Sequence, residues 1–141
     1  MTMRINKGNL LDAAVRGDVP IVMHGANCFH TFGSGIAGEA ARRFPEIPEA
    51  DRTTGHGNPM KLGDYSLAKV TYEVLPVDPK GKPWQDKLAK NEVILDNPFT
   101  CINLYTQFKP GKDFIESIFP SALHQLVLIF CSKIDSIFIL L

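Results

Sequence analysis

The sequence predicts an α/β layered domain, and three observations support this fold class. An apolar run of strand length at 20–26 precedes a polar loop and then a helix at 36–44, in which apolar residues recur at every fourth position. Further strand-like runs follow, the clearest of them at 100–106. The chain shows no internal repeat and no linker, so we expect a single domain over 1–141.

The patterns before the loop predict three short elements. Residues 3–7 alternate and end at a glycine, which predicts a short strand that runs into a turn. Residues 10–16 form one or two helical turns, which the Gly17-Asp18 pair ends. The run at 20–26 is bounded by turn signals and predicts a buried central strand.

The next segment combines a loop with helix signals. Residues 27–35 are polar and rich in glycine, and the helix at 36–44 ends because Phe44 precedes a proline. Residues 45–59 contain three prolines and two glycines, so we expect a mobile loop or a loosely helical excursion there.

The second half of the chain predicts strands, turns and an apolar tail. The expected strands are 61–70 and 71–77 (one or two strands around a turn), 92–95, 100–106 and 134–141; the expected turns are 78–90 and 109–112; helical spacing covers part of 114–130. Of the 19 residues at 123–141, 13 are apolar, but Lys133 and Asp135 would each cost about 2.5–3.5 kcal/mol inside a bilayer. We therefore expect no transmembrane anchor, and 1–11 shows no signal peptide.

Composition excludes several classes of protein. Lys and Arg number 15, as do Asp and Glu, so the chain lacks the basic excess typical of nucleic-acid binding. Cys28, Cys101 and Cys131 form neither a disulfide framework nor a zinc site, which indicates a reducing cytoplasm. No two of the four histidines have metal-ligand spacing. We expect a cytoplasmic monomer without metal, cofactor, nucleic-acid or membrane partner.

Three glycines follow the strand at 20–26 and open the next helix. Gly33, Gly35 and Gly38 have the spacing G-x-G-x-x-G, which allows close backbone approach and directs the first helical amides at an anion. The alternative is a tight turn whose small residues pack against the helix. A dinucleotide site would need an acidic residue about 20 positions on at a strand end, whereas Asp51 lies 13 after Gly38 in an expected loop. The lysine of a Walker loop is absent.

Four motifs in order resemble the macro domain family, which binds ADP-ribose. They are Ile5-Asn6-Lys7-Gly8-Asn9-Leu10-Leu11; Gly25-Ala26-Asn27-Cys28 followed by Phe32-Gly33-Ser34-Gly35-Ile36-Ala37 and a helix ending Arg43-Phe44-Pro45-Glu46; Lys61-Leu62-Gly63-Asp64; and Ile102-Asn103-Leu104-Tyr105-Thr106-Gln107. The resemblance covers about 3–113 and is closest to the small ADP-ribose 1''-phosphate phosphatases found in yeast and phages. It implies an α/β/α sandwich around a mixed sheet, incomplete at the C-terminal end, with 114–141 atypical of the family.

The resemblance also implies a role for Asn9. It occupies the adenine-binding Asp position of the family, beside the backbone amide of Leu10, and its amide oxygen would accept the adenine N6 hydrogen bond without charge assistance. Asn9 could also cap the helix at 10–16, and the two roles are compatible.

Further roles fall on the loop that precedes the glycines and on the glycines themselves. Asn27 would bind the distal ribose and orient the reacting group or its water; the alternative is a turn-forming Asn. Phe32 would lie under the ribose or belong to the core. The distal ribose and the diphosphate would be wrapped by Gly33, Ser34, Gly35, Ile36 and Ala37.

The histidines receive different predictions. His30 lies between Asn27 and Gly33, where it could act as a proton shuttle. His24 is expected to pack in the core, on the opposite side of the strand from Asn27. His56 is expected to be exposed.

Two departures from the family bear on activity. One branch uses a Lys directly after the Thr of the late strand to remove ADP-ribose from glutamate, but Gln107 follows Thr106 here. No glycine occurs after Gly111, so the second phosphate loop of the family is missing. Our first hypothesis is binding of ADP-ribose with hydrolysis of the terminal phosphate of ADP-ribose 1''-phosphate. The alternatives are a non-catalytic ADP-ribose-binding module, a truncated or frame-shifted inactive macro domain and, less strongly indicated, removal of ADP-ribose from protein or DNA.

Overall fold

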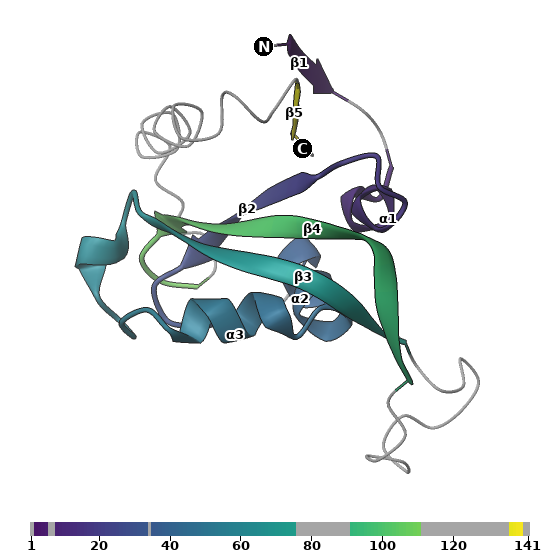
Figure 1. Cartoon of the computed structure of the whole chain (residues 1–141). Helices are drawn as coiled ribbons and strands as arrows, with labels where there is room; N and C mark the ends of the chain where they lie inside the picture. The colour runs from purple at the N-terminus through teal and green to yellow at the C-terminus, as the bar shows by residue number, and fades with distance from the viewer. Residues whose placement is uncertain (1, 6–7, 34, 76–90, 111–135, 140–141) are drawn as a thin grey trace.

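The computed structural model describes residues 2–5, 8–33, 35–75, 91–110 and 136–139 (Figure 1). In chain order the elements are β1 (Thr2–Ile5), α1 (Leu10–Val15), β2 (Ile21–Asn27), α2 (Gly35–Arg43), α3 (Glu46–Arg52), the 3-10 turn η1 (Pro59–Lys61), β3 (Tyr65–Leu75), β4 (Asn91–Gln107) and β5 (Ser136–Ile139). The predicted turn at 78–90 and the helical spacing at 114–130 lie outside the described residues. Within the described part, no helix has the length and apolar character needed to cross a bilayer.

A mixed sheet of three strands forms the centre of the described structure. β4 lies between β2, to which it is parallel, and β3, to which it is antiparallel. β1 and β5 form a separate parallel pair, which confirms strands within 3–7 and 134–141. Among the described strands the central position belongs to β4, and the strand predicted at 20–26 pairs with one of its edges.

The three helices bury their apolar side chains in one core against the sheet. This core joins the buried faces of α1, α2 and α3 to Val22 of β2, Val70 of β3 and Phe99 of β4. The rings of Phe44 and Phe99 meet edge to face, with centroids 5.2 Å apart. A smaller apolar cluster contains Ile102, from a position of β4 that alternates with the core side chains. Helices packed on a mixed sheet confirm the α/β prediction.

Helix α3 supports the helical alternative for the first part of 45–59, and it is regular and packed in the core. Pro45 stands at the N-cap and Pro48 in the first turn, where a helix does not use the backbone N–H that proline lacks. Ile47 and Asp51 lie four residues apart and are both buried. The prolines therefore open a regular helix that the core holds in place.

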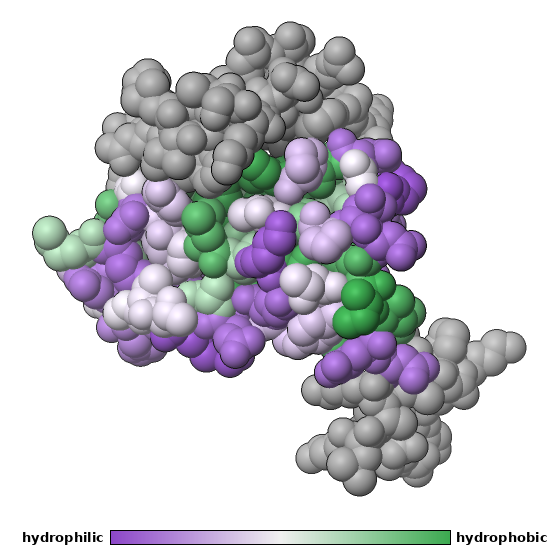
Figure 2. Space-filling model, in the orientation of Figure 1, coloured by the Kyte–Doolittle hydropathy of each residue, from purple (hydrophilic) through white to green (hydrophobic). Residues whose placement is uncertain are grey.

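The β3–β4 ribbon joins segments that were predicted separately. Its register passes from Val70 opposite Phe99 to Tyr72 opposite Ile94, so the residues between Ile94 and Phe99 bulge and Pro98 does not interrupt the ladder. Exposed apolar side chains gather at the far end of this ribbon, which Figure 2 shows as an apolar patch: Leu75, Val93 and Ile94. The other end of β4 leads to a cavity.

Candidate functional site

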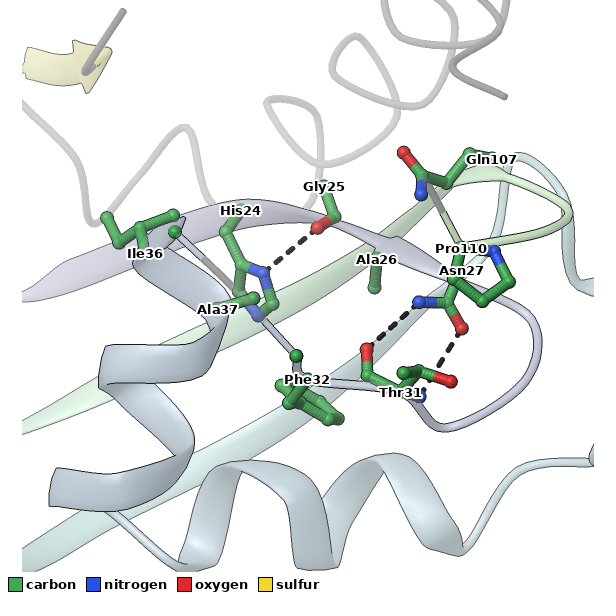
Figure 3. A pocket seen from close by; sticks show the side chains of 12 residues that line it. His24, Gly25, Ala26, Asn27, Thr31, Phe32, Ile36, Ala37, Gln107 and Pro110 are labelled. Carbon is green, nitrogen blue, oxygen red and sulfur yellow. Dashed lines mark hydrogen bonds between the residues drawn. The ribbon is translucent and has the colours of Figure 1, made fainter. Parts of the chain in front are cut away.

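A cavity of about 350 Å³ lies where the parallel strands β2 and β4 end (Figure 3). Its walls come from these strand ends, the loop after β2 and the first turn of α2. The lining residues are His24, Gly25, Ala26, Asn27, Thr31, Phe32, Gly33, Gly35, Ile36, Ala37, Gln107 and Pro110. Ligands of α/β proteins bind beyond the carboxyl ends of parallel strands, so this cavity is the candidate site.

The glycines leave open space at the start of α2. A Cβ added at Gly33 or Gly35 would meet no atom within 4 Å beyond the adjoining residues, and the φ of +61° at Gly35 favours glycine. A Cβ at Gly38 would lie 3.3 Å from the carbonyl carbon of Gly33, so Gly38 lets the loop pack closely on the helix. The backbone N–H groups of the first turn have no partner within a helix, and they begin at this open space. Ser34, also predicted here, lies outside the described residues.

Asn27 is buried at the end of β2 and uses its side chain to hold the loop. Its Oδ1 accepts hydrogen bonds from the backbone N–H of Phe29 at 2.9 Å and of Thr31 at 3.4 Å. Its Nδ2 donates to the carbonyl of Thr31 at 2.9 Å, and Figure 3 draws both bonds to Thr31. This is the turn-forming role, in a residue that also lines the cavity. Within the described structure one Nδ2 hydrogen remains for a ligand.

His30 does not line the cavity. Its φ of 58° is unusual for a residue with a side chain, and its Nδ1 lies 2.8 Å from Oδ2 of the buried Asp51. The ring stacks on that of His56, with centroids 5.4 Å apart. His56 is exposed, as predicted. The structure thus places His30 on the side of the loop that faces α3.

Asn9 caps helix α1, and Leu10 is buried behind it. The Oδ1 of Asn9 accepts from the backbone N–H of Leu11 at 3.0 Å and of Asp12 at 3.1 Å, which occupies both of its lone pairs. The Nδ2 donates to Glu39 of α2 at 3.1 Å. Neither Asn9 nor Leu10 lines the cavity.

His24 is a cavity residue that the sequence pattern assigned only to the core. It is buried, as predicted, and its ring centroid lies 6.0 Å from that of Phe32. It borders the same cavity as Asn27 because the cavity lies at the end of β2 and is lined by every residue from His24 to Asn27. Burial lowers the pKa of His24, against the opposing effect of its hydrogen bonds and of Asp51.

A row of buried polar side chains continues from His24 into the core. His24 Nε2 lies 2.6 Å from Asn103 Oδ1, and Asn103 Nδ2 donates to Ser66 Oγ at 3.1 Å. Ser66 in turn donates to Tyr105 OH at 3.0 Å, and Tyr105 donates to Asp51 Oδ1 at 2.6 Å. We call Asn103, Ser66, Tyr105 and Asp51 the buried polar row.

The hydrogen bonds of the buried polar row bear on the protonation of Tyr105 and on the orientation of the Asn103 amide. Burial, followed by the hydrogen bond to Asp51, raises the pKa of Tyr105 to about 12, so the phenol stays protonated and donates. Because Asn103 Nδ2 donates to Ile47 O and Ser66, the Asn103 oxygen faces His24 Nε2 as an acceptor. Nδ1 lies 3.0 Å from the carbonyl of Gly25. Both ring nitrogens therefore face protein atoms.

Comparison with solved structures identifies the fold. The macrodomain of Thermus aquaticus DarG superposes with a TM-score of 0.55, over 93% of this chain and 70% of that one, at 18% sequence identity. The chain has the macrodomain fold. No family model matches the sequence.

Comparison by sequence connects the chain to a phage protein. An uncharacterized 17.5 kDa protein from the tk-vs intergenic region of enterobacteria phage T4 is 34% identical over 115 residues, which are 81% of this chain. The chain spans 59% of the length of that relative. The phage relative agrees with the predicted similarity to phage proteins.

Proposed function

We propose that this chain binds ADP-ribose, or its 1''-phosphate, in the cavity at the ends of β2 and β4. The observation that supports this best is the open space over Gly33 and Gly35 at the start of α2. Free amides and the positive end of a helix dipole favour a diphosphate there. In the proposal Gly33, Ser34, Gly35, Ile36 and Ala37 wrap the diphosphate and the distal ribose, and Phe32 lies under that ribose.

We further propose that this site hydrolyses the terminal phosphate of ADP-ribose 1''-phosphate. Asn27 lines the cavity, and its remaining Nδ2 hydrogen could orient the phosphate or the attacking water. Water would form a bond to phosphorus while the bond from phosphorus to the ribose oxygen breaks, which yields ADP-ribose and inorganic phosphate. The amides at the start of α2 would stabilise the negative charge that develops on the phosphoryl oxygens.

His30 is proposed as the proton shuttle of this reaction. It would have to exchange its bond with Asp51 for one to water or substrate. A His30→Gln variant that binds normally but loses turnover supports this role; one that retains turnover assigns His30 to the structure of the loop.

The test is calorimetric titration of the full chain with ADP-ribose, combined with a phosphate-release assay on ADP-ribose 1''-phosphate. We expect Asn27→Asp, which keeps the acceptor oxygen for Phe29 and Thr31, to lower affinity at least about tenfold through lost donors and added charge. Asn27→Ala should lose affinity and also unfold more readily. Asn97→Ala, a change at an exposed residue outside the cavity, is the control and should bind like the wild type.

The outcomes separate the alternatives. Binding with phosphate release supports the phosphatase. Binding without release of phosphate supports a non-catalytic module, and release of ADP-ribose from a modified protein or DNA would support the hydrolase. Absence of any heat of binding contradicts the proposal and favours an inactive macro domain.

A further inference from the structure

The ring of His24 faces an oxygen acceptor at each of its two nitrogens. Its Nε2 lies 2.6 Å from Oδ1 of Asn103, and its Nδ1 lies 3.0 Å from the carbonyl oxygen of Gly25 (Figure 3). The Asn103 oxygen is held toward the ring because the amide nitrogen donates to the carbonyl of Ile47 and to Ser66. A neutral imidazole has one N–H and one lone pair, so it can donate to only one of the two oxygens, whereas an imidazolium donates to both.

Burial acts against this second proton. It disfavours the charged ring and lowers the pKa of His24, while the two hydrogen bonds and the carboxylate of Asp51 act in the opposite direction. Asp51 lies on α3, and the residues that face the ring from β4 and from the loop, Asn103 and Phe32, carry no charge. In the free protein the ring is therefore mostly neutral at about pH 7, and one of its oxygen neighbours faces a lone pair.

The cavity has no other source of full positive charge among its described residues. Of the described residues that line it, His24 is the one with a titratable side chain; the others are glycines, apolar residues and the neutral Asn27, Thr31 and Gln107. A diphosphate would bring two negative charges into this space, and the amides at the start of α2 carry only partial charges. Coulomb attraction from such an anion stabilises the imidazolium and offsets the cost of its burial.

We infer that His24 takes up a proton when an anion binds in the cavity, and that its imidazolium is then the charged side chain that the cavity presents to the ligand. The inference rests on the proposed function, since it takes the occupant of the cavity to be an anion. Because both N–H groups of the imidazolium donate to Asn103 and Gly25, the ring acts on the ligand through its charge and not through a hydrogen bond. Binding is then coupled to pH.

The experiment is calorimetric titration of the full chain with ADP-ribose at about pH 6.8, in two buffers of different ionisation enthalpy, MOPS and imidazole. The difference between the two heats of binding gives the number of protons taken up. The diphosphate of ADP-ribose stays fully ionised at this pH, so a proton that is taken up goes to the protein. The same titration is made with His24→Gln and with His56→Gln, the matched control at an exposed histidine outside the cavity.

Proton NMR of the His24 ring in the wild type gives a second measurement that needs no variant. Its C–H signals, assigned through bonds from the backbone, report the charge of the ring with and without ADP-ribose. They should move toward the imidazolium position when the ligand binds. Signals that stay at the neutral position in the saturated complex would overturn the inference, even if His24→Gln fails to fold.

We expect the wild type and His56→Gln to take up at least about 0.3 proton per ligand, and their affinity to fall at least about fivefold between pH 6 and pH 8. His24→Gln should take up none and change its affinity less than about twofold over this range. Binding by the wild type without proton uptake, or equal uptake in His24→Gln, would overturn the inference and leave the proposed function intact. If ADP-ribose does not bind at all, the proposed function fails and this inference fails with it.

Discussion

The loop between β2 and α2 and the buried polar row beside it both contain polar groups, but their hydrogen bonding differs. In the loop, Asn27 keeps a spare donor, and Gly33 and Gly35 stand next to open space. In the buried polar row, each side chain from Asn103 to Asp51 finds its partner among the neighbouring side chains. His24 belongs to both regions, since it lines the cavity and contacts Asn103.

The difference separates a surface that can receive a ligand from a network that holds the fold. Spare donors beside open space can form new bonds with an anion, whereas a satisfied buried network gains nothing from a ligand and loses much when it is broken. Substitutions in the buried polar row should therefore change stability, and those in the loop should change binding.

Replacement of Asp51 by Ala should give the largest effect. It leaves Tyr105 OH and His30 Nδ1 without their shared acceptor, and we expect the free energy of unfolding to fall by about 3 kcal/mol in urea denaturation. Asp18→Ala, which removes an exposed partner of Arg16, should change it by less than about 1 kcal/mol. A loss below about 1 kcal/mol in Asp51→Ala would mean that the buried polar row does not hold the fold.

Substitutions at two glycines test the same difference, and we expect their effect on stability to be of intermediate size. A Cβ at Gly25 would lie 2.7 Å from Thr106 Oγ1, so we expect Gly25→Ala to cost about 1–3 kcal/mol of unfolding free energy. Thr106→Ala removes the clashing oxygen and should restore part of this loss in the double variant. Gly33→Ala meets no atom within 4 Å and should unfold like the wild type, but bind ADP-ribose more weakly. Equal stability losses in the two glycine variants would contradict the distinction.

The smallest effect concerns pH and His24. Since burial holds the pKa of His24 below its ordinary value of 6.5, the unfolded chain binds this proton at a higher pH than the folded chain. The free energy of unfolding should therefore decrease as pH falls below about 6.5, by at most about 1.4 kcal/mol per pH unit, until the pH passes the folded pKa.

Urea denaturation between pH 5 and 8 measures this contribution. His24→Gln should flatten the slope, whereas His56→Gln, at an exposed histidine, should leave it unchanged. An identical slope in His24→Gln and the wild type would show that other groups cause the pH dependence.

Local patterns predicted most of the elements near the site. The cap at Asn9, the buried strand at Ile21–Asn27 and the glycine-opened helix at Gly35–Arg43 depend on residues close in sequence, where turn chemistry and periodicity act. At α3 the sequence left a loop and a loosely helical excursion open, because prolines suit a helix only when they stand at its start.

What the tertiary structure alone decided are the contacts between distant residues. The cavity at the end of β2 is lined by both His24 and Asn27, Asp51 contacts the ring of His30, and Glu39 contacts Asn9 across 30 positions of sequence. Sequence periodicity says nothing of where a cavity opens or of which helix packs beside which loop. By itself the sequence determined the loop, the helix start and the residue types available to a ligand. Packing then decided which polar atoms were consumed by the fold and which remain to bind.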